Sequence, residues 1–400
     1  MRPDFLAEVA KGQLGLNAGL PNCFDRFNKF LFGTHKRTYY AVGGLPGSGK
    51  SGFVDDNFVL SPYFKTKDKG LPTKHYHWHY YSFEVDYLSK RAKWTAYRLY
   101  QKYNVLCDSN FLLGKGVIRD LNGKVISSPQ NISYHPGLEA KIKDVTDEID
   151  ELFDHITFID DSMNPTGIFR EIMAWANSHG TFHYENYDII EDYTKPHVVK
   201  TGSRISGYTL HNPDDINIII ADHVALAKRE RNYSLKDNID KLSEYFIFLR
   251  NKCDYITVPV VQFNKGLTAI DRQKFKRELL LPSLEDFKDT GNIGQDCNVA
   301  LGLFNPFKMD FEDHLGYPIM PNLGSRTRPA FEDKFRAINI MKNRDGEEWR
   351  HIGMQYLGGL GKYTELPLPE LFDLGTQKVE NYINIKPINS TQYATNTSTN

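Results

Sequence analysis

The sequence predicts an α/β protein with a mostly parallel central sheet, flanked by helices and completed by a C-terminal β-hairpin. From about residue 37 onward, apolar β-rich runs alternate with segments of helical periodicity, which is the pattern of units that build a parallel sheet. The run INIIIAD at 216–222 is continuously apolar, as expected of a strand covered on both faces. FRAINIMK and EWRHIGMQYLG, joined across 343–346, predict the hairpin.

The other elements follow in chain order. Strands are predicted for TYYAVGG, for the aromatic run ending near Ser82, and for HITFIDD, ITVPVVQF and VALGLF. Residues 104–136 are punctuated by Gly, Asn, Ser and Pro, which favours irregular structure with a hairpin around DLNGKV. Helices are predicted from Lys50 and over 87–103. Three further helices are predicted from apolar stripes, the second of them opened by Asn164-Pro165: Leu138, Ile142, Val145, Ile149, Leu152; Ile168, Phe169, Ile172, Met173, Ala176; and Leu235, Ile239, Leu242, Phe246, Leu249.

These signals divide the chain into three parts. Residues 1–35 are expected to be a short lead-in, and residues 36–365 the main domain, with a polar insertion at 178–214. Residues 366–400 are expected to be an extension, and we expect its Asn/Ser/Thr-rich end to be disordered.

Composition excludes several classes of protein. With 49 Lys+Arg against 50 Asp+Glu, any surface that binds a polyanion must be a local patch. Cys23, Cys107, Cys253 and Cys297 lack CxxC or zinc-like spacing, which indicates free thiols in a reducing compartment. The N-terminus lacks the apolar region of a signal peptide, and no window approaches the ~18 apolar residues of a membrane span. We therefore expect a cytoplasmic protein without membrane contact.

The stretch GLPGSGKS, from Gly44 to Ser51, matches the phosphate-loop pattern G-x-x-x-x-G-K-S between a predicted strand and a predicted helix. Glycines let the backbone turn its N–H groups toward phosphate oxygens, Lys50 reaches the terminal phosphates, and Ser51 offers a hydroxyl to Mg²⁺. A glycine-rich turn that binds nothing is the alternative. The pattern in this context predicts a site for ATP and Mg²⁺, formed by Gly44, Pro46, Gly47, Ser48, Gly49, Lys50 and Ser51.

Two carboxylates are candidates for the same site. Asp222 ends the buried run NIIIAD and is expected to bind the metal, although such a residue can also cap a turn. Many P-loop ATPases have their catalytic glutamate directly after this aspartate. Here the next residue is His223, so a catalytic carboxylate must come from elsewhere. Glu84 follows the aromatic strand and is expected to orient the attacking water. Its alternative role is to cap the helix that begins near Tyr87.

The histidines of KHYHWHYYSFEV fall at every second position and share one face of the predicted strand. His75, His77 and His79 could bind zinc, but no further ligand shows matching spacing. A half-buried polar face or a contact surface is the favoured interpretation.

Taken together, the motifs resemble the RecA-like P-loop ATPase core of the DnaB-type replicative helicases, from about Gly19 to Gly361. YYSFEVDYLSKR is similar to the strand with the family's catalytic glutamate, and IIIADHVAL to the stretch with its metal-side aspartate. VPVVQFNKG resembles the strand whose glutamine senses the γ-phosphate, which is Gln262 here. SLEDFKDTGNIGQDCNVAL resembles the loop that holds single-stranded DNA, which assigns contacts to Lys288, Asp289 and Gly291.

The resemblance extends to the hairpin. IMKNRDG is similar to the segment whose lysine and arginine reach the γ-phosphate of the neighbouring subunit, which are Lys342 and Arg344 here. It implies a DNA helicase that works as a homo-hexameric ring in the cytoplasm of a bacterial cell, encoded by the cell or by a phage. His223 and Lys288 depart from the family's tyrosine and arginine. Only a few dozen residues precede the expected core, so we expect the family's primase-contacting N-terminal domain to be missing, and primase and loader are possible partners that the resemblance leaves open.

A basic segment lies between Gln262 and Lys288. KGLTAIDRQKFKR at 265–277 contains one acidic residue and a cluster of cations, which can be either a solvated loop or a site for the phosphates of single-stranded DNA. Its position favours the DNA contact, through Lys265, Arg272, Lys274, Lys276 and Arg277.

Three functions remain open at this level. The leading one is an ATP-dependent helicase or translocase on single-stranded DNA in replication. The second is a RecA/KaiC-like DNA-dependent ATPase that does not unwind DNA. The third is a nucleotide-dependent scaffold with slow hydrolysis.

Overall fold

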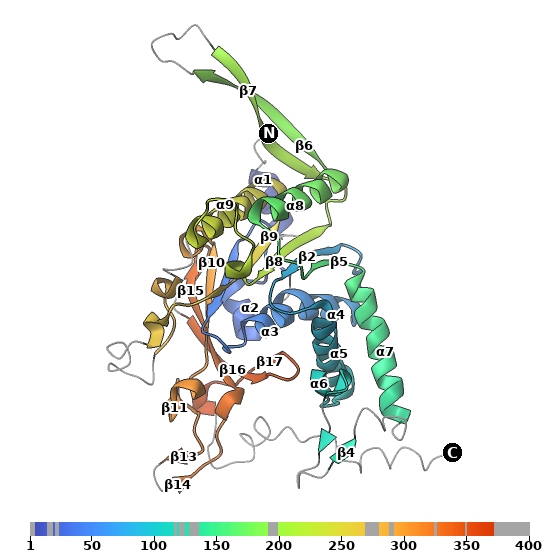
Figure 1. Cartoon of the computed structure of the whole chain (residues 1–400), viewed down its shortest axis with the longest axis vertical. Coiled ribbons are helices and arrows are strands. Elements are labelled where there is room, and N and C mark those ends of the chain that lie inside the picture. Colours follow the sequence, from blue (N-terminus) through green and yellow to red (C-terminus); the bar gives the residue numbers. More distant parts are fainter. Residues whose placement is uncertain are drawn as a thin grey trace.

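A nine-stranded sheet forms the centre of the computed structural model, which describes residues 5–13, 19–20, 24–115, 118–119, 125–127, 136–190, 199–268, 280–287, 292–323, 326–348 and 350–371 (Figure 1). Six strands run parallel, in the order β10 (Val299–Phe304), β1 (Tyr40–Gly44), β9 (Ile256–Gln262), β8 (Ile216–Asp222), β2 (Tyr76–Ser82) and β5 (Ile156–Ile159).

The remaining strands extend the sheet beyond β10 in antiparallel fashion. They are β15 (Phe335–Asn343), β16 (Arg350–Leu357) and β17 (Lys362–Glu365). The predicted fold class is confirmed, including the hairpin of β15 and β16. The short strand β17 was not predicted.

Helices cover both faces of the sheet. One face carries α2 (Asp25–Leu31), α5 (Tyr87–Tyr103), α7 (Pro136–Phe153) and a continuous helical run formed by α3 (Lys50–Asp55), the π-helical segment η1 (Asp56–Leu60) and α4 (Ser61–Lys67). The other face carries α8 (Pro165–His179) and α9 (Leu235–Cys253). The predicted stripes of α7, α8 and α9 all point into these two cores, so those predictions are confirmed.

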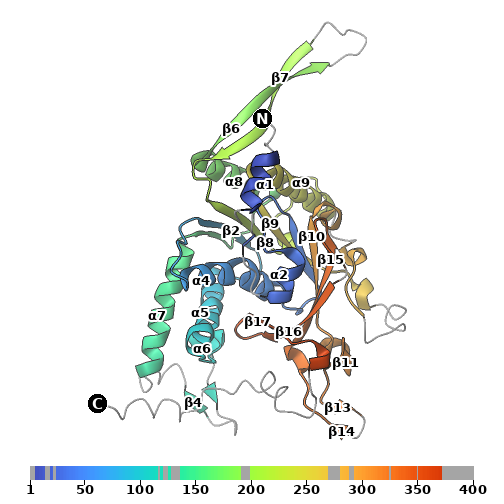
Figure 2. The ribbon, with the colours of Figure 1, turned by 180° about the vertical axis from the view of Figure 1, so that it is seen from behind.

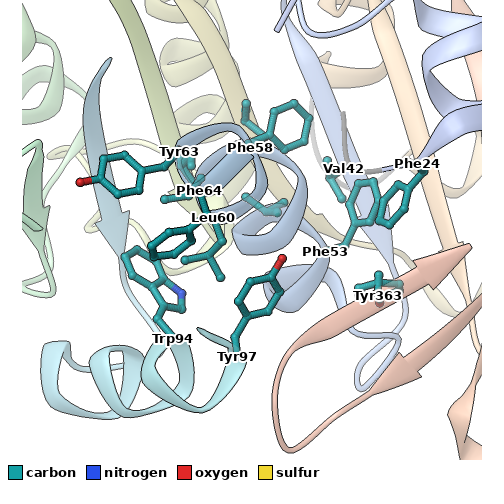
Figure 3. Packing of buried hydrophobic residues seen from close by; sticks show 14 of the residues in the cluster. Phe24, Val42, Phe53, Phe58, Leu60, Tyr63, Phe64, Trp94, Tyr97 and Tyr363 are labelled. Carbon is teal, nitrogen blue, oxygen red and sulfur yellow. The ribbon is translucent and has the colours of Figure 1, made fainter. Parts of the chain in front are cut away.

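Aromatic side chains gather around the helical run of α3, η1 and α4 in this core (Figure 3). Phe53 of α3 stacks on Phe24 and meets Phe27 and Tyr363 edge to face. Phe24 and Phe27 precede residue 36, the expected start of the main domain, yet they are almost fully buried in its core. The first helix, α1 (Phe5–Gln13), comes before them.

Polar caps explain where the main helices begin. The Asp86 side chain accepts a hydrogen bond from the Ser89 N–H at the start of α5, and Asn164 caps α8 in the same way. Ser234 and Asp237 form a reciprocal capping box at the start of α9.

The segment expected to be a polar insertion contains two long strands. β6 (Gly180–Ile190) and β7 (Val199–Leu210) form an antiparallel hairpin that projects away from the main sheet (Figures 1 and 2). Sequence analysis did not predict these strands, because a ribbon exposed on both faces lacks the apolar alternation that reveals a half-buried strand. Tyr184, for example, is 65% exposed.

Short elements complete the described chain. The predicted hairpin around DLNGKV is confirmed by the pairing of β3 with β4. None of the described helices is both long enough and apolar enough to pass through a lipid bilayer. The short elements are α6 (Ser109–Leu112), β3 (Ile118–Arg119), β4 (Val125–Ser127), η3 (Val224–Leu226), η4 (Lys265–Thr268), η6 (Leu284–Phe287), α11 (Ile293–Asp296), η7 (Phe307–Met309), β11 (Asp313–His314), β12 (Tyr317–Pro318), β13 (Asn322–Leu323), β14 (Arg326–Thr327), η8 (Glu332–Lys334) and η9 (Pro369–Leu371).

Candidate nucleotide-binding site

The phosphate-loop motif forms the connection between β1 and the helical run that starts at Lys50. Gly47 and Gly49 have φ values of 71° and 92°, a region that residues with a Cβ rarely adopt. The Ser48 N–H donates to the Leu45 carbonyl at 3.1 Å and closes the turn. The loop therefore leads directly into the first, unpaired N–H groups of a helix, which favour an anion.

Two side chains from the antiparallel strands donate hydrogen bonds to backbone carbonyls of this loop. Arg336 of β15 is buried, and its Nε donates to the Ser48 carbonyl at 3.1 Å. The Tyr363 hydroxyl of β17 donates to the Gly49 carbonyl at 3.0 Å. Neither residue was predicted, because contacts between residues 288 or more positions apart leave no local signal in the sequence.

Lys50 lies within the loop that it is expected to serve. Its ammonium donates to the carbonyls of Gly44 and Leu45 at 3.0 and 3.1 Å. Burial lowers the pKa of Lys50 below its ordinary value, and the carboxylates of Asp222 and Glu84 oppose that shift. The cation is therefore held close to two acidic groups, where a bound phosphate would add further negative charge.

Asp222 ends β8 directly beside Ser82 of β2, and its carbonyl accepts a hydrogen bond from the Phe83 N–H at 2.8 Å. The residue is 1% exposed, and neither carboxylate oxygen has a hydrogen-bond partner among the described residues. Burial raises the pKa of the Asp222 carboxyl, while Lys90 and the nearby Ser51 hydroxyl favour the ionised form.

The donor set of Asp222 and Ser51 fits a divalent cation. Two buried carboxylate oxygens without partners and a hydroxyl are oxygen ligands, which Mg²⁺ prefers, and it binds few protein groups because it keeps waters and phosphate oxygens. The described residues hold no group of three or more His, Cys, Asp or Glu side chains that could bind a metal by itself.

Glu84 follows β2 and lines the same cavity as Lys50 and Ser51. The N-cap of α5 is Asp86, so the start of this helix is satisfied without Glu84. Gln262 ends β9 in register with Gly44 and is exposed toward the cavity. The cavity has a volume of about 240 Å³ and is lined by Pro46, Gly47, Gly49, Lys50, Ser51, Gly52, Glu84, Lys93, His223, Gln262 and Tyr356.

Comparison with known proteins identifies this architecture. No protein-family model and no curated protein matches the chain. Among solved structures, an ATPase domain superposes with a TM-score of 0.58 at 15% identity, over 90% of this chain and 97% of that one. A DnaB-like replicative helicase, described with its interactions with primase, matches with a TM-score of 0.57 at 15% identity, over 92% of this chain and 69% of that one. The chain therefore shares the fold of this ATPase domain and of the DnaB-like replicative helicase.

Within this DnaB-type fold, Lys342 and Arg344 lie away from the cavity. Lys342 is opposite Ala300 near the start of β10, whereas the phosphate loop follows Gly44, which is opposite Leu303 near its end. At about 3.3 Å per residue, this separation places the two cations at the far end of the sheet from the chain's own phosphate loop.

Most candidate DNA contacts lie outside the described residues: Arg272, Lys274, Lys276, Arg277, Lys288, Asp289 and Gly291. Only the backbone of Lys265 is described, in η4. The described flanks of the two segments are neighbours, since the Asn264 N–H donates to the Asp286 carbonyl at 3.3 Å and the rings of Phe263 and Phe287 lie 5.0 Å apart.

A second basic segment was missed by the sequence analysis. Lys228, Arg229 and Arg231 are exposed in the connection between η3 and α9, shortly after Asp222. The cluster AKRER was visible in the sequence, but it is shorter than the run at 265–277.

The histidine-rich strand packs against α8. His75 and His77 each place a ring nitrogen 3.6 Å from Asp215 Oδ1. His79 is buried against Trp175, and burial lowers its pKa to about 3. His79 is therefore neutral at physiological pH. The three histidine side chains lie where β2 contacts Asp215 and Trp175.

Proposed function

We propose that this chain is an ATP-dependent motor that translocates along single-stranded DNA and separates duplex DNA during replication. The main observation that supports this proposal is that one cavity of this fold brings together the phosphate loop, Glu84 and Gln262, with Asp222 beside it. These side chains come from β1, β2, β8 and β9, whose carboxyl ends meet at one edge of the sheet.

Each residue has a defined part in hydrolysis. Lys50 and the loop N–H groups bind the triphosphate, and Ser51 and Asp222 would hold Mg²⁺, which neutralises charge on the phosphates when bound. Glu84 orients a water molecule toward the γ-phosphate and accepts its proton. Gln262 is paired with Gly44 in the sheet, and the chain continues from it into η4. It is therefore placed to report the state of the γ-phosphate to the DNA-binding segments.

Assembly into a hexameric ring completes the site. Lys342 and Arg344 are too far from their own phosphate loop to stabilise its transition state, and both point to the same carbonyl, that of Gln295. In a ring, this end of one subunit can meet the nucleotide edge of the next. Hydrolysis then depends on assembly, as it does for arginine fingers supplied in trans.

DNA would bind through the segments that flank η4 and η6. Phe263 connects them to the nucleotide site, because its N–H donates to the Gly44 carbonyl at 3.1 Å and its ring packs on Phe287. A shift at the phosphate loop therefore has a short packed route to the base of both segments.

The deciding experiment combines a forked-duplex unwinding assay with native mass spectrometry of the nucleotide-bound protein. ATP-dependent strand separation by a hexamer supports the proposal. ATPase stimulation by single-stranded DNA without strand separation would favour the RecA/KaiC-like alternative. Slow hydrolysis that is indifferent to DNA would favour the scaffold.

A further inference from the structure

A buried ion pair lies behind the nucleotide site. The Lys90 ammonium of α5 lies 3.2 and 3.3 Å from the two carboxylate oxygens of Asp55 in α3, and it donates to the Tyr80 hydroxyl at 2.9 Å. The Tyr80 hydroxyl in turn donates to Asp55 at 2.7 Å. The side chains of Lys90 and Asp55 are only 2% and 3% exposed.

The same ammonium approaches the metal-side aspartate. Lys90 Nζ lies 3.9 Å from Asp222 Oδ2, whose side chain is 2% exposed. Neither carboxylate oxygen has a partner within hydrogen-bond geometry among the described residues, and the Ser51 hydroxyl lies nearby. Lys90 is therefore the cation that faces Asp222 from the side of α5.

The ion pair also joins two segments that carry site residues. Lys90 lies in the first turn of α5, which begins shortly after Glu84. Asp55 ends α3, which begins with Lys50 and Ser51. The Lys90–Asp55 contact therefore fixes the base of the Glu84 segment against the helix of the phosphate loop.

Folding alone does not require charges at these positions. Burying an ammonium and a carboxylate carries a large desolvation penalty, and apolar side chains of similar volume often stabilise a core equally well or better. Apolar neighbours are available on one side of the network, where Trp94 and Phe158 pack on the Tyr80 ring. The ion pair thus points to a role in the site that it touches.

We propose that Lys90 and Asp55 act as a clamp that positions Asp222 and the Glu84 segment for magnesium and nucleotide. Lys90 is a positioning residue, because it acts through Asp222 and the backbone after Glu84 and does not touch the nucleotide cavity. The inference rests on the assignment of an ATP–Mg²⁺ site in the proposed function, but not on DNA binding or unwinding.

The decisive variant replaces the network by apolar groups: Asp55→Leu, Tyr80→Phe and Lys90→Met together. One positive and one negative charge disappear, so the net charge around Asp222 is unchanged. Asp55→Asn is a milder second variant that keeps the shape and removes the ion pair. Lys90 acts on Asp222 more strongly than Asp55 does, so the field at this carboxylate still changes in the triple variant, and Asp55→Asn changes it in the opposite sense because the Lys90 cation stays. A rise in the magnesium requirement of both variants therefore reflects position and not charge.

Arg98→Met serves as the matched control. Arg98 lies on the same helix, is equally buried, and pairs with Asp68 and Glu148 at 2.6 Å, remote from Asp222. Its loss is expected to lower the unfolding midpoint and to leave the magnesium requirement unchanged.

The measurement is the affinity of fluorescent mant-ADP over a series of Mg²⁺ concentrations, without DNA, together with urea unfolding. We expect the triple variant to unfold near the wild-type midpoint and to need about tenfold more Mg²⁺ for half-maximal tight binding, as for other residues that support metal ligands. Its kcat for ATP should fall by a similar factor.

A wild-type magnesium requirement and kcat in the triple variant or in Asp55→Asn would overturn the clamp. Failure of both variants to fold would do the same, because it would assign the pair to folding. If wild-type protein binds mant-ADP with Mg²⁺ but does not unwind DNA, the proposed motor fails while the clamp is still judged by this measurement.

Discussion

The Lys342 ammonium donates to the Gln295 carbonyl at 2.6 Å, and the Arg344 guanidinium donates to the same oxygen at 3.1 Å. Two cations proposed to act on a neighbour's nucleotide are thus held by α11, a short helix that follows the expected DNA segment at 288–291. A neighbouring phosphate is a stronger partner than a neutral carbonyl, because both groups are then charged. Assembly around nucleotide is therefore expected to release them from α11.

Arg344→Ala tests whether this cation acts between subunits. We expect its ATPase rate to fall about 10³-fold or more, the range of arginine fingers. Lys50→Ala should be equally inactive, because it removes the phosphate ligand within each subunit. Mixing the two inactive proteins should restore part of the activity, since some interfaces then pair an intact Lys50 with an intact Arg344.

Arg350→Ala is the control for this experiment. Arg350 lies on the same hairpin and pairs with Glu347 at the surface, so its loss should leave the rate within about twofold of wild type, as for most exposed ion pairs. Full activity of a monomer, or no recovery in the Lys50→Ala and Arg344→Ala mixture, would contradict the neighbour assignment.

Glu84→Gln separates catalysis from binding. The variant keeps the size of the side chain and loses the base, so we expect nucleotide affinity near wild type and hydrolysis slower by about 10²–10⁴-fold. Single-turnover ATP hydrolysis alongside mant-ADP binding measures both quantities.

Asp86→Ala is the matched comparison for Glu84. It removes the N-cap of α5, so it should lower the free energy of unfolding and change hydrolysis much less than Glu84→Gln does. The reverse result, with Glu84→Gln unfolding more easily yet hydrolysing normally, would make Glu84 a structural residue.

The parts of the site that sequence predicts are those encoded in short motifs. The phosphate loop and the buried strand ending in Asp222 are local patterns with a single geometry, so their placement at one edge of a parallel sheet follows from the strand–helix alternation. Glu84 was harder to place, because its motif is only an acid after a strand.

Residues that depend on long-range packing left no such signal. Arg336 and Tyr363 reach the phosphate loop from the far end of the chain, and Lys90 reads in sequence as one cation of a basic helix. Their roles come from strand order, which joins β15 to β10 and β8 to β2, and no single segment specifies that order.

Asp222→Asn is expected to make the protein more stable and catalytically inactive. Burial raises the pKa of Asp222, so the folded state disfavours its ionised form, and this penalty is present at neutral pH. The variant should therefore raise the free energy of unfolding at pH 7 without nucleotide, and it should lose Mg²⁺-dependent hydrolysis.

The pH dependence of the stability difference between the two proteins tests this prediction separately. As pH falls through the raised pKa toward the ordinary pKa of aspartate, wild-type Asp222 becomes protonated in the folded and then the unfolded state, so the difference between the two proteins should shrink. Urea unfolding of both proteins from pH 7 to pH 4 measures it. A variant that is less stable than wild type at pH 7 would show that the Asp222 charge is net stabilising through Lys90.

The exposed cations after η3 provide a test of the DNA path that uses only described residues. Replacing Lys228, Arg229 and Arg231 by alanine removes positive charge near the nucleotide edge while sparing Glu230, which accepts a hydrogen bond from the Thr166 N–H. If these cations bind phosphates, affinity for single-stranded oligonucleotides should fall for every sequence. The slope of log K against log salt should then shrink by about one for each phosphate that no longer has a cation beside it.

The matched control replaces three cations elsewhere on the molecule. Lys65→Ala, Lys67→Ala and Lys69→Ala remove the same charge from the end of α4 and the turn that follows it, so the net charge of the two triple variants is identical. Because counterion release depends on cations that touch DNA and not on total charge, only the first variant should change the salt slope. Equal slopes for both variants would place the DNA elsewhere on the molecule.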